Sequence, residues 1–502
     1  MDYLDPEKRR KHTQRLFIGY GLMAVLIVLG TIILSLLAFG YSFDRRTGTV
    51  IQNGLLFVDT NPIDAEVYIN DDSQGSGSQR LVLPAGEYTI DIREDGYRSW
   101  HKDIRLAGGS VERFAYPFLF PEELTRSQYR SFNTEPELIT TSPDRRWMLI
   151  QEADQLDAFV LYDLRQQINL PSFFSLPVGV MNSTAEGSTL ELIEWSNNNR
   201  HLIVKHTHDT GEEYVLIDRD EPGNSQNLTA RFSDTAFTDI SLLDKQFDEY
   251  HLFNRETGEL YVAELGEDTA ELLLSNVITY RTHGSERILY VSSEPLNVTA
   301  EPNEDTEDYR GVYIYQDAES TRIANTPAGT VSDYLLDLAR FDGSWYVVIG
   351  NRNENRANVY QEPLDNLTED DDTARSDSTL YTDSTPERVT FSGNARNIMM
   401  QAGNQFAVYD LEREQSYRYE FGSDSISPAY WMDGHRILAI WDDTLYVTDF
   451  DGENRHELVT CHADKRPLFD TSYEYLYCVE PDDEDNTVFG RLVRLSLLAK
   501  DD

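Results

Sequence analysis

The segment KHTHD carries the residue types best suited to chemistry in this chain. His206 and His208 are two positions apart, so they share one face of a strand, and with Asp209 they have the donor types to chelate a metal ion. The metal-binding pattern H-x-H-x-D-H needs Asp at position 210 and His at position 211, where this chain has Thr210 and Gly211. We therefore interpret the segment as a strand end at the surface and predict no metal site.

Two cysteines, Cys461 and Cys478, are the only thiols in the sequence. Without a pair of C-x-x-C motifs they cannot form a thiolate zinc site. Cys461 ends the predicted strand HELVT, and Cys478 lies within YEYLYCV. In an oxidising compartment the two can form a disulfide, provided that their Cα atoms lie within ~7 Å of each other. Two buried free thiols are the open alternative.

Other catalytic motifs are absent from the sequence. There is no G-x-S-x-G nucleophile elbow, no P-loop and no H-E-x-x-H, so we expect no cofactor and no motif-defined catalytic residue. The acidic tracts AEPNEDTEDY and LTEDDDTARSDSTLYTDSTPE lack the ligand spacing of an EF-hand and are interpreted as solvated loops. A pair of carboxylates that hydrolyses a glycan leaves no sequence motif and stays possible.

The charge of the chain restricts its partners. Its 502 residues include 88 Asp and Glu but 43 Lys and Arg, which gives a net charge of −45. This field repels nucleic acid and anionic lipid headgroups, so neither is an expected partner of the bulk of the protein.

A long apolar segment near the N-terminus predicts membrane attachment. Residues 16–43 carry no charge, and five basic residues precede them. About 20 apolar residues span a bilayer, and the basic flank keeps residues 1–15 in the cytoplasm. The chain beyond about residue 44 is then outside the cell. A cleaved signal peptide, with Ala38 and Gly40 at the cleavage site, is the alternative, but the apolar segment is longer than a signal peptide usually has.

The segment LPAGEYTIDIREDGYRSW has the pattern of strand and turn residues that is typical of a small β-fold. Its apolar residues alternate at Tyr88, Ile90 and Ile92, which predicts a strand with one buried face. Turn residues flank this strand: Pro84, Gly86 and Gly96. Three aromatic side chains are expected to fill a core rather than hold a ligand: Tyr88, Tyr97 and Trp100.

Residues 53–121 resemble the PEGA domain, a compact β-sandwich-like module of prokaryotic envelope proteins. The resemblance is carried by Gly54, Leu55, Pro62, Ala65, Val67, Tyr68, Ile69, the run Pro84 to Tyr88, Gly96 and Tyr97. The usual Gly-x-Thr-Pro turn is replaced by GSGSQR, so this loop is expected to differ in shape. The resemblance implies a structural role at the cell surface, similar to that of S-layer proteins, and no catalytic residues.

Residues 124–502 contain an internal sequence repeat. Eight units can be recognised, each with a polar turn and two apolar strands, and the second strand often ends in Tyr-Asp or a similar pair. The 379 residues divided by eight give about 47 per unit, close to the ~40–45 of a propeller blade. The unit YWMDGHRILAIWDDTLYVTDFDGENRHELV, with its turn at residues 449–454, resembles a blade of a TolB-type propeller. We predict a mainly β protein with a seven- or eight-bladed β-propeller.

These features together predict a single-pass, cell-surface protein of the prokaryotic envelope. Its propeller is expected to act as a non-enzymatic binding or scaffolding platform for an envelope protein or a glycan. Two alternatives stay open: an extracytoplasmic enzyme that processes glycans or peptides with carboxylates in the propeller channel, and a sensor that signals through a membrane partner. The cytoplasmic tail is too short to fold into an effector domain.

Overall fold

The structure is a computed structural model, and strands dominate it. It describes residues 6–38, 40–43, 50–132, 136–151, 155–165, 170–182, 188–267, 269–285, 287–296, 308–368, 373–422, 426–480 and 490–499. Strands make up 54% of the chain and helices 9%, which confirms the predicted mainly β class. The chain divides into two compact units, Met1–Glu123 and Leu124–Lys500, called unit 1 and unit 2 below.

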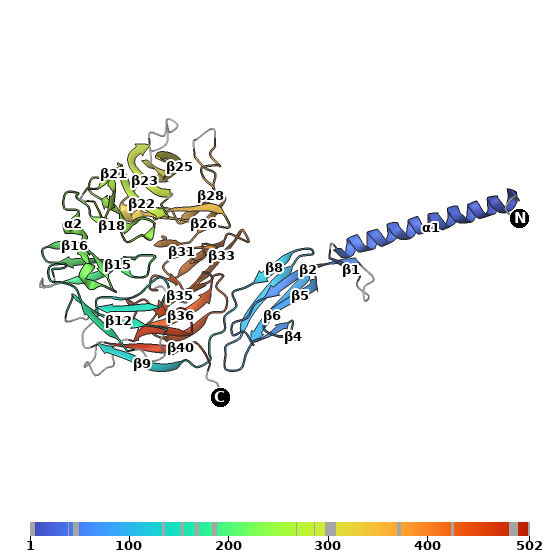
Figure 1. Ribbon diagram of the computed structural model, residues 1–502, viewed down its shortest axis with the longest axis horizontal. Helices are drawn as coiled ribbons and strands as arrows, with labels where there is room; N and C mark the ends of the chain where they lie inside the picture. Colours follow the sequence, from blue (N-terminus) through green and yellow to red (C-terminus); the bar gives the residue numbers. More distant parts are fainter. Residues whose placement is uncertain are drawn as a thin grey trace. The chain divides into compact units, whose positions relative to one another are not determined.

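Unit 1 begins with the long helix α1 (Pro6–Ala38) (Figure 1). The part from His12 to Leu36 has a mean hydropathy of 2.5 and is not buried in the protein, so by length and composition it is a candidate membrane span. The helix ends before the predicted apolar segment does, because Tyr41–Phe43 form the short strand β1 instead.

Two four-stranded sheets follow in unit 1. One has the order β1-β2-β5, with β8 parallel to β2, and the other has the order β4-β3-β6-β7. The strands are β2 (Val50–Val58), β3 (Glu66–Ile69), β4 (Asp72–Ser76), β5 (Gln79–Pro84), β6 (Gly86–Arg93), β7 (Trp100–Leu106) and β8 (Val111–Phe114). The two sheets approach closely at Gly54, where a Cβ atom would lie 2.5 Å from Cγ of Leu106, so only glycine fits there.

The turn residues lie where this two-sheet fold needs them. Pro84 ends β5 and Gly86 begins β6, so the chain passes from one sheet to the other within one residue. Gly96 has φ +79°, a conformation that side chains disfavour. Trp100 is buried and packs on Phe114, with their ring centroids 6.1 Å apart.

Tyr88 and Tyr97 lie differently from Trp100, because both are only half-buried. The Tyr88 hydroxyl instead donates a hydrogen bond of 2.8 Å to the carbonyl of Pro84. The alternation of β6 is nevertheless clear, since Ile90 and Ile92 are fully buried.

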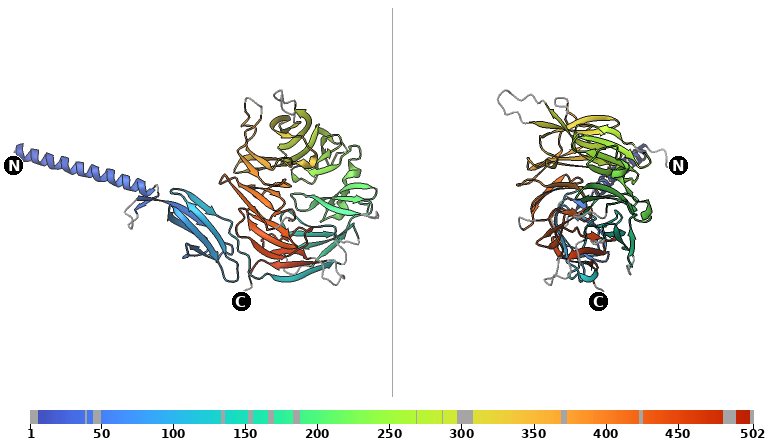
Figure 2. Two further views of the ribbon diagram at one scale, coloured as in Figure 1. Left: turned by 180° about the vertical axis from the view of Figure 1, so that it is seen from behind. Right: turned by 90° about the vertical axis from the view of Figure 1, so that its left-hand side faces the viewer.

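Unit 2 contains eight four-stranded antiparallel sheets within its described residues (Figures 1 and 2). We number them sheet 1 to sheet 8. Their first strands are β10 (Ile139–Thr141), β14 (Thr189–Trp195), β18 (Asp239–Leu242), β22 (Val277–His283), β26 (Tyr334–Phe341), β30 (Arg388–Phe391), β34 (Tyr430–Trp431) and β38 (Leu468–Phe469). Their second strands are β11 (Trp147–Gln151), β15 (His201–His208), β19 (Glu249–Asn254), β23 (Arg287–Leu296), β27 (Ser344–Asn351), β31 (Asn397–Ala402), β35 (Arg436–Trp441) and β39 (Tyr475–Glu480).

The outer half of each sheet consists of a third and a fourth strand. The third strands are β12 (Ala158–Asp163), β16 (Gly211–Asp218), β20 (Glu259–Glu264), β24 (Tyr309–Gln316), β28 (Arg356–Gln361), β32 (Gln405–Asp410), β36 (Thr444–Asp449) and β40 (Gly490–Ser496). The fourth strands are β13 (Ser172–Ser175), β17 (Gln226–Asn227), β21 (Glu271–Leu274), β25 (Glu319–Pro327), β29 (Ser378–Tyr381), β33 (Gln415–Glu420), β37 (His456–Thr460) and β9 (Thr125–Phe132). Short helices lie in the loops: η1 (Pro222–Asn224), α2 (Leu228–Arg231), η2 (Leu243–Lys245) and η3 (Val331–Asp333).

The eight sheets form a closed ring. Apolar clusters join sheet 8 to sheet 1 and then each sheet to the next as far as sheet 6. Phe421 after sheet 6 contacts Tyr446 of sheet 7 with ring centroids 6.4 Å apart. The first strands of neighbouring sheets also contact one another, as β22 does β26 and β26 does β30, so these are the inner strands of the ring.

The ring is closed by a strand from the beginning of unit 2. β9 pairs antiparallel with β40, so that the earliest strand completes sheet 8 beside the latest one. This pairing was not part of the sequence prediction, which looked for two strands per repeat. It joins the two ends of the unit by backbone hydrogen bonds and makes β9 the outer strand of sheet 8.

Candidate functional site

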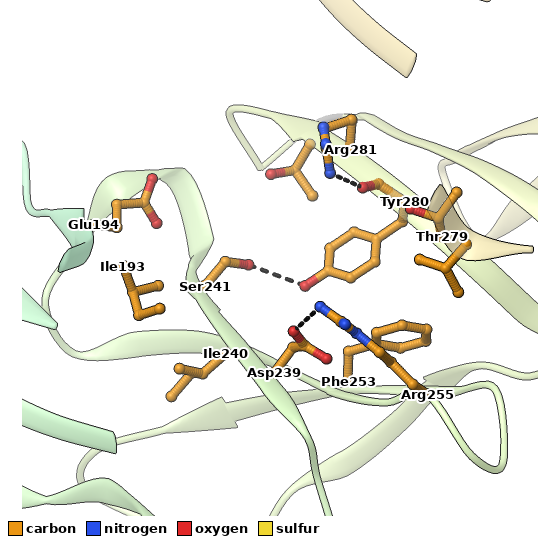
Figure 3. A pocket seen from close by; sticks show the side chains of 12 residues that line it. Ile193, Glu194, Asp239, Ile240, Ser241, Phe253, Arg255, Thr279, Tyr280 and Arg281 are labelled. Atoms are coloured by element: carbon orange, nitrogen blue, oxygen red, sulfur yellow. Dashed lines mark hydrogen bonds and ion pairs between the residues drawn. The ribbon is translucent and has the colours of Figure 1, made fainter. Parts of the chain in front are cut away.

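Two adjoining cavities lie along the inner strands of unit 2. The first, of about 470 Å³, is lined by β14, β18 and β22 with the residues that follow β19 (Figure 3). The second, of about 430 Å³, is lined by β22, β26 and β30. They share four lining residues, Arg255, Thr279, Arg281 and Val331, so they are continuous, and we call them together the inner-strand cavity. Both volumes lie within the ~300–1,000 Å³ of typical ligand pockets.

Tyr280 forms an aromatic wall of the first cavity. Its hydroxyl lies 3.1 Å from Oγ of Ser241, and its ring meets Phe253 edge-on at 5.3 Å between centroids (Figure 3). Burial raises the pKa of Tyr280 to about 12, so the phenol stays neutral at physiological pH. Tyr280 is therefore a hydrogen-bonding group and an apolar surface, not a base.

The carboxylates of the inner-strand cavity are mostly engaged by the protein itself. Glu194 accepts hydrogen bonds from the backbone N–H of Leu242 at 2.8 Å and from Nζ of Lys245 at 2.5 Å. Asp239 forms an ion pair with Arg255. These two groups therefore position strands β14 and β18 against their neighbours.

Asp337 is the carboxylate most perturbed by its surroundings. Burial raises its pKa, while the backbone N–H groups of Phe391 and Leu338 each donate to it at 2.9 Å. These bonds lock the side chain between β26 and β30. Glu387 is the remaining acid of the cavity, and its side chain forms no hydrogen bond or ion pair with another described residue.

Three of the four arginines that line the inner-strand cavity donate to backbone carbonyls. Arg281 donates to the carbonyl of Tyr280 at 3.0 Å, Arg352 to that of Glu387 at 3.0 Å, and Arg388 to that of Ala429 at 3.1 Å. No carboxylate among the described residues forms an ion pair with any of these three guanidinium groups. Nε of Arg352 is in addition buried without a hydrogen-bond partner.

An aromatic ring of sheet 7 lies beside Arg388 and a further arginine. Tyr430 of β34 has the guanidinium of Arg388 4.9 Å from its ring centroid and that of Arg466 at 4.8 Å. Burial lowers the pKa of Arg466, and the nearby positive charge of Arg388 acts in the same direction. Two guanidinium groups therefore share one tyrosine ring.

The environment of the histidine segment KHTHD differs from the one that the sequence predicted. His206 on β15 is fully buried, so the interpretation as a surface strand end is wrong for this residue. Its partner is Glu213 on the paired strand β16, with Nδ1 of the histidine 2.8 Å from Oε1 of the glutamate. A possible ligand group consists of His206, His208 and Glu213, with donor atoms within 4.8 Å of one another, and it does not include Asp209.

The surroundings of Glu213 decide how this group is best interpreted. Its oxygens accept hydrogen bonds from the backbone N–H of Asn182 at 2.6 Å and from Nδ2 of Asn227 at 2.7 Å. These bonds and burial have opposite effects on the carboxyl, and its pKa is lowered overall although burial is the largest single effect. The carboxylate is thus satisfied by protein donors, which is typical of a buried structural network.

The two cysteines lie together at the junction of sheets 7 and 8. Cys461 directly follows β37, and Cys478 lies in β39. The structure joins them by a disulfide, with their Cα atoms 5.8 Å apart. Whether the bond forms in the cell stays a prediction, tested below.

Sequence reasoning missed the inner-strand cavity and its arginines. Arg281 and Arg388 lie on inner strands, and Arg352 directly follows β27. The sequence signal that could have identified Arg281 and Arg388 is a basic residue shortly before the polar turn of a repeat, as in ITYRTHG and PERVTFSG. The acidic tract at residues 300–309 lies almost entirely outside the described residues.

Comparisons with known proteins agree with the two units. Residues 53–118 match the model of the PEGA domain family. None of the curated proteins matches the chain significantly. Among solved structures, the dihydro-heme d1 dehydrogenase NirN in complex with DHE is 13% identical, with a TM-score of 0.42 and coverage of 80% of this chain and 73% of that one.

Two further solved structures are similar at the same level. The Cps50 (Swd1) β-propeller domain of Myceliophteria thermophila is 10% identical, with a TM-score of 0.38 and coverage of 75% and 99%. An oligogalacturonate lyase in complex with manganese is 11% identical, with a TM-score of 0.40 and coverage of 75% and 96%. Likenesses this distant carry no argument about activity. Residues 53–118 are thus a PEGA domain, and the ring of sheets that follows it in the chain is a β-propeller.

Proposed function

We propose that this chain is a single-pass membrane protein of the prokaryotic envelope, with residues 1–15 in the cytoplasm and the PEGA domain and propeller outside. The apolar helix α1 supports the membrane attachment, and the basic residues before it support the orientation. The PEGA domain supports the envelope location.

The propeller acts in this proposal as a binding platform rather than as an enzyme. The observation that carries it is the continuous inner-strand cavity, which has polar and aromatic walls and three arginines without ion pairs. Hydrolysis by a carboxylate pair needs two acids that are free to reach the substrate. In this cavity Glu194, Asp239 and Asp337 are already engaged by protein donors, which favours binding over turnover.

Photo-crosslinking in intact cells tests this proposal. Val331 lies at the rim shared by both cavities, so a photoreactive amino acid placed there samples the proposed site. Val178 is also an exposed valine of unit 2 but lines neither cavity, and it serves as the matched control. We expect a covalent adduct with an envelope component from position 331 and none from position 178.

Two results would contradict the proposal. Equal adducts from both positions would mean that the cavity is not the binding site. Turnover of a glycan or peptide library by the purified chain, abolished by Glu387→Gln, would favour the enzyme alternative instead, because Glu387 is the cavity carboxylate that has no partner in the described structure.

A further inference from the structure

We propose that the inner-strand cavity binds a short anionic oligomer, a ligand that carries several oxyanions along its length. This inference rests on the proposed function, because it names the chemistry of the ligand that the cavity takes. It follows from how the arginines of unit 2 are distributed and paired.

Many arginines outside the cavity are paired with acids, while others, such as Arg310 and Arg340, donate to backbone carbonyls. Arg146, Arg200 and Arg396, for example, each bind an aspartate with at least one contact of 3.0 Å or less. In a chain with 88 acidic and 43 basic residues, a guanidinium without a carboxylate is unexpected by composition alone.

Three arginines that form no ion pair with a described carboxylate line one continuous cavity, which also contains the carboxylates of Asp337 and Glu387. Arg281, Arg352 and Arg388 donate only to backbone carbonyls, so most of their N–H groups stay available to a ligand. The buried and unpartnered Nε of Arg352 is a donor that a bound oxyanion would satisfy. A carboxylate, sulfate or phosphate fits the planar fork of guanidinium donors, often with two hydrogen bonds at once.

The arrangement of these arginines indicates an oligomer rather than a single ion. Arg281 belongs to sheet 4, Arg388 belongs to sheet 6, and Arg352 directly follows β27 of sheet 5. Tyr430, with Arg388 and Arg466 over its ring, lies on the next sheet of the ring. A chain with repeated charges can contact the cavity arginines and Arg466 at the same time. Tyr280 and Tyr430 add flat apolar surfaces on which ring-shaped units of a ligand can stack.

The net charge of −45 sets a limit on the length of the ligand. A long polyanion would lie beyond the cavity against an acidic surface and be repelled. A short oligomer, or the end of a longer chain, interacts electrostatically mainly with the arginines of the cavity. At an ionic strength of ~0.15 M the Debye length is about 8 Å, so the long-range repulsion is screened while contacts inside the cavity persist.

Binding to the full chain in lipid nanodiscs tests this inference. Four probes of equal length are titrated by calorimetry at ~0.15 M salt: a hexauronate, a sulfated hexasaccharide, a hexaphosphate chain and a neutral hexaglucan. The three anionic arms distinguish the possible sources of the oxyanion. The variants are Arg281→Gln and Arg388→Gln, and Arg340→Gln is the matched control, because Arg340 also donates to a backbone carbonyl but lines neither cavity.

We expect at least one anionic probe to bind, and each cavity variant to weaken its binding by about tenfold, the usual effect of losing a charged hydrogen bond. Arg340→Gln is expected to bind like the wild type. Equally tight binding of the neutral hexaglucan, no binding of any anion, or wild-type affinity in both cavity variants would overturn the inference. The crosslink from position 331 does not depend on ligand charge, so it can succeed even if the anionic ligand is wrong.

Discussion

Arg396 and Asp410 form a bidentate ion pair across the hairpin of β31 and β32. Nε of the arginine lies 3.0 Å from Oδ1 of the aspartate and Nη2 lies 2.7 Å from Oδ2, and the aspartate side chain is fully buried. The same relationship joins Arg146 to Asp163 in sheet 1 and Arg200 to Asp218 in sheet 2. In each case an arginine just before the second strand binds the last residue of the third strand, which gives the recurrent Tyr-Asp ending of the repeats a structural role.

Removing one partner of this pair should destabilise the propeller. Asp410→Ala leaves a nearly buried arginine without its buried counter-charge, and it removes the Oδ1 atom that accepts from the backbone N–H of Glu412. We expect a loss of about 3–5 kcal/mol in the free energy of unfolding, measured by urea denaturation. Glu412→Gln is the matched control, because Glu412 contacts the same arginine from an exposed position and should matter by less than about 1 kcal/mol. Equal effects of the two variants would refute the argument from burial.

The disulfide between Cys461 and Cys478 can be tested chemically. The bond would close a loop with a sequence separation of 17 and would link the end of sheet 7 to sheet 8, the sheet at which the ring closes. The double variant Cys461→Ala/Cys478→Ala is expected to be less stable by about 3 kcal/mol. Mass spectrometry of the unfolded, non-reduced chain decides whether the bond is present. Two freely alkylated cysteines would show that it is not.

The stability of the propeller should depend on pH through His251. Burial lowers the pKa of His251 to about 4 from its ordinary value of 6.5, and its Nδ1 is buried without a hydrogen-bond partner. The unfolded chain therefore takes up a proton as the pH falls below 6.5, whereas the folded chain resists protonation until about 4. The stability present above pH 6.5 is thus lost as the pH falls toward 4, by roughly 3 kcal/mol for a shift of this size.

The variant His251→Gln, which has no titrating group at this position, measures this effect. Its free energy of unfolding should fall less than that of the wild type between pH 7 and pH 4, when both are followed by urea denaturation. Replacing an exposed histidine, as in His283→Gln, should leave the pH dependence of the wild type in place. Parallel curves for wild type and His251→Gln would contradict the assignment.

The proposed topology predicts the outcome of protease treatment. Protease added to intact cells should digest the chain beyond about residue 44 and leave only a small membrane-bound fragment that contains α1. A tag at the N-terminus should become accessible only after the cells are permeabilised. Protection of the C-terminus in intact cells would reverse the orientation, and a mature chain that lacks α1 would identify a cleaved signal peptide.

The pair His206 and Glu213 predicts a structural role rather than zinc binding. Glu213→Gln should destabilise unit 2 by about 1.5–3 kcal/mol, because it removes a charged acceptor of three hydrogen bonds. Zinc should leave the melting temperature of the wild type unchanged. A rise in melting temperature on addition of zinc that is lost in both Glu213→Gln and His208→Ala would instead identify a metal site.

Local patterns determined much of the fold. Leu16 to Leu36 are helical, and a helix satisfies its backbone hydrogen bonds within one segment, without a distant partner. The alternation in β6 placed Ile90 and Ile92 inside. Gly96 adopts positive φ, which is a property of the residue itself. The repeated strand pairs could be recognised because each pair is built from residues close in sequence, and their regular period indicated a propeller.

Tertiary structure alone decided which distant residues meet. Asp209 was the neighbour of the histidines in sequence, but strand pairing placed Glu213 beside His206. Side chains opposite each other on paired strands share one face of the sheet, whereas consecutive side chains point to opposite faces. The pairing of β9 with β40 joins segments from the two ends of the propeller, and no local pattern encodes such a partner.

The inner-strand cavity depends on the same kind of long-range assembly. Arg281, Arg352 and Arg388 lie in three different repeats, and each looks in sequence like any other surface base. They become one site only because the ring brings inner strands from successive sheets together, and a free guanidinium can be recognised only when its surroundings are known. The sequence by itself therefore determined the apolar N-terminal helix, the two kinds of β-domain and their order, while the lining of the inner-strand cavity follows from packing between repeats.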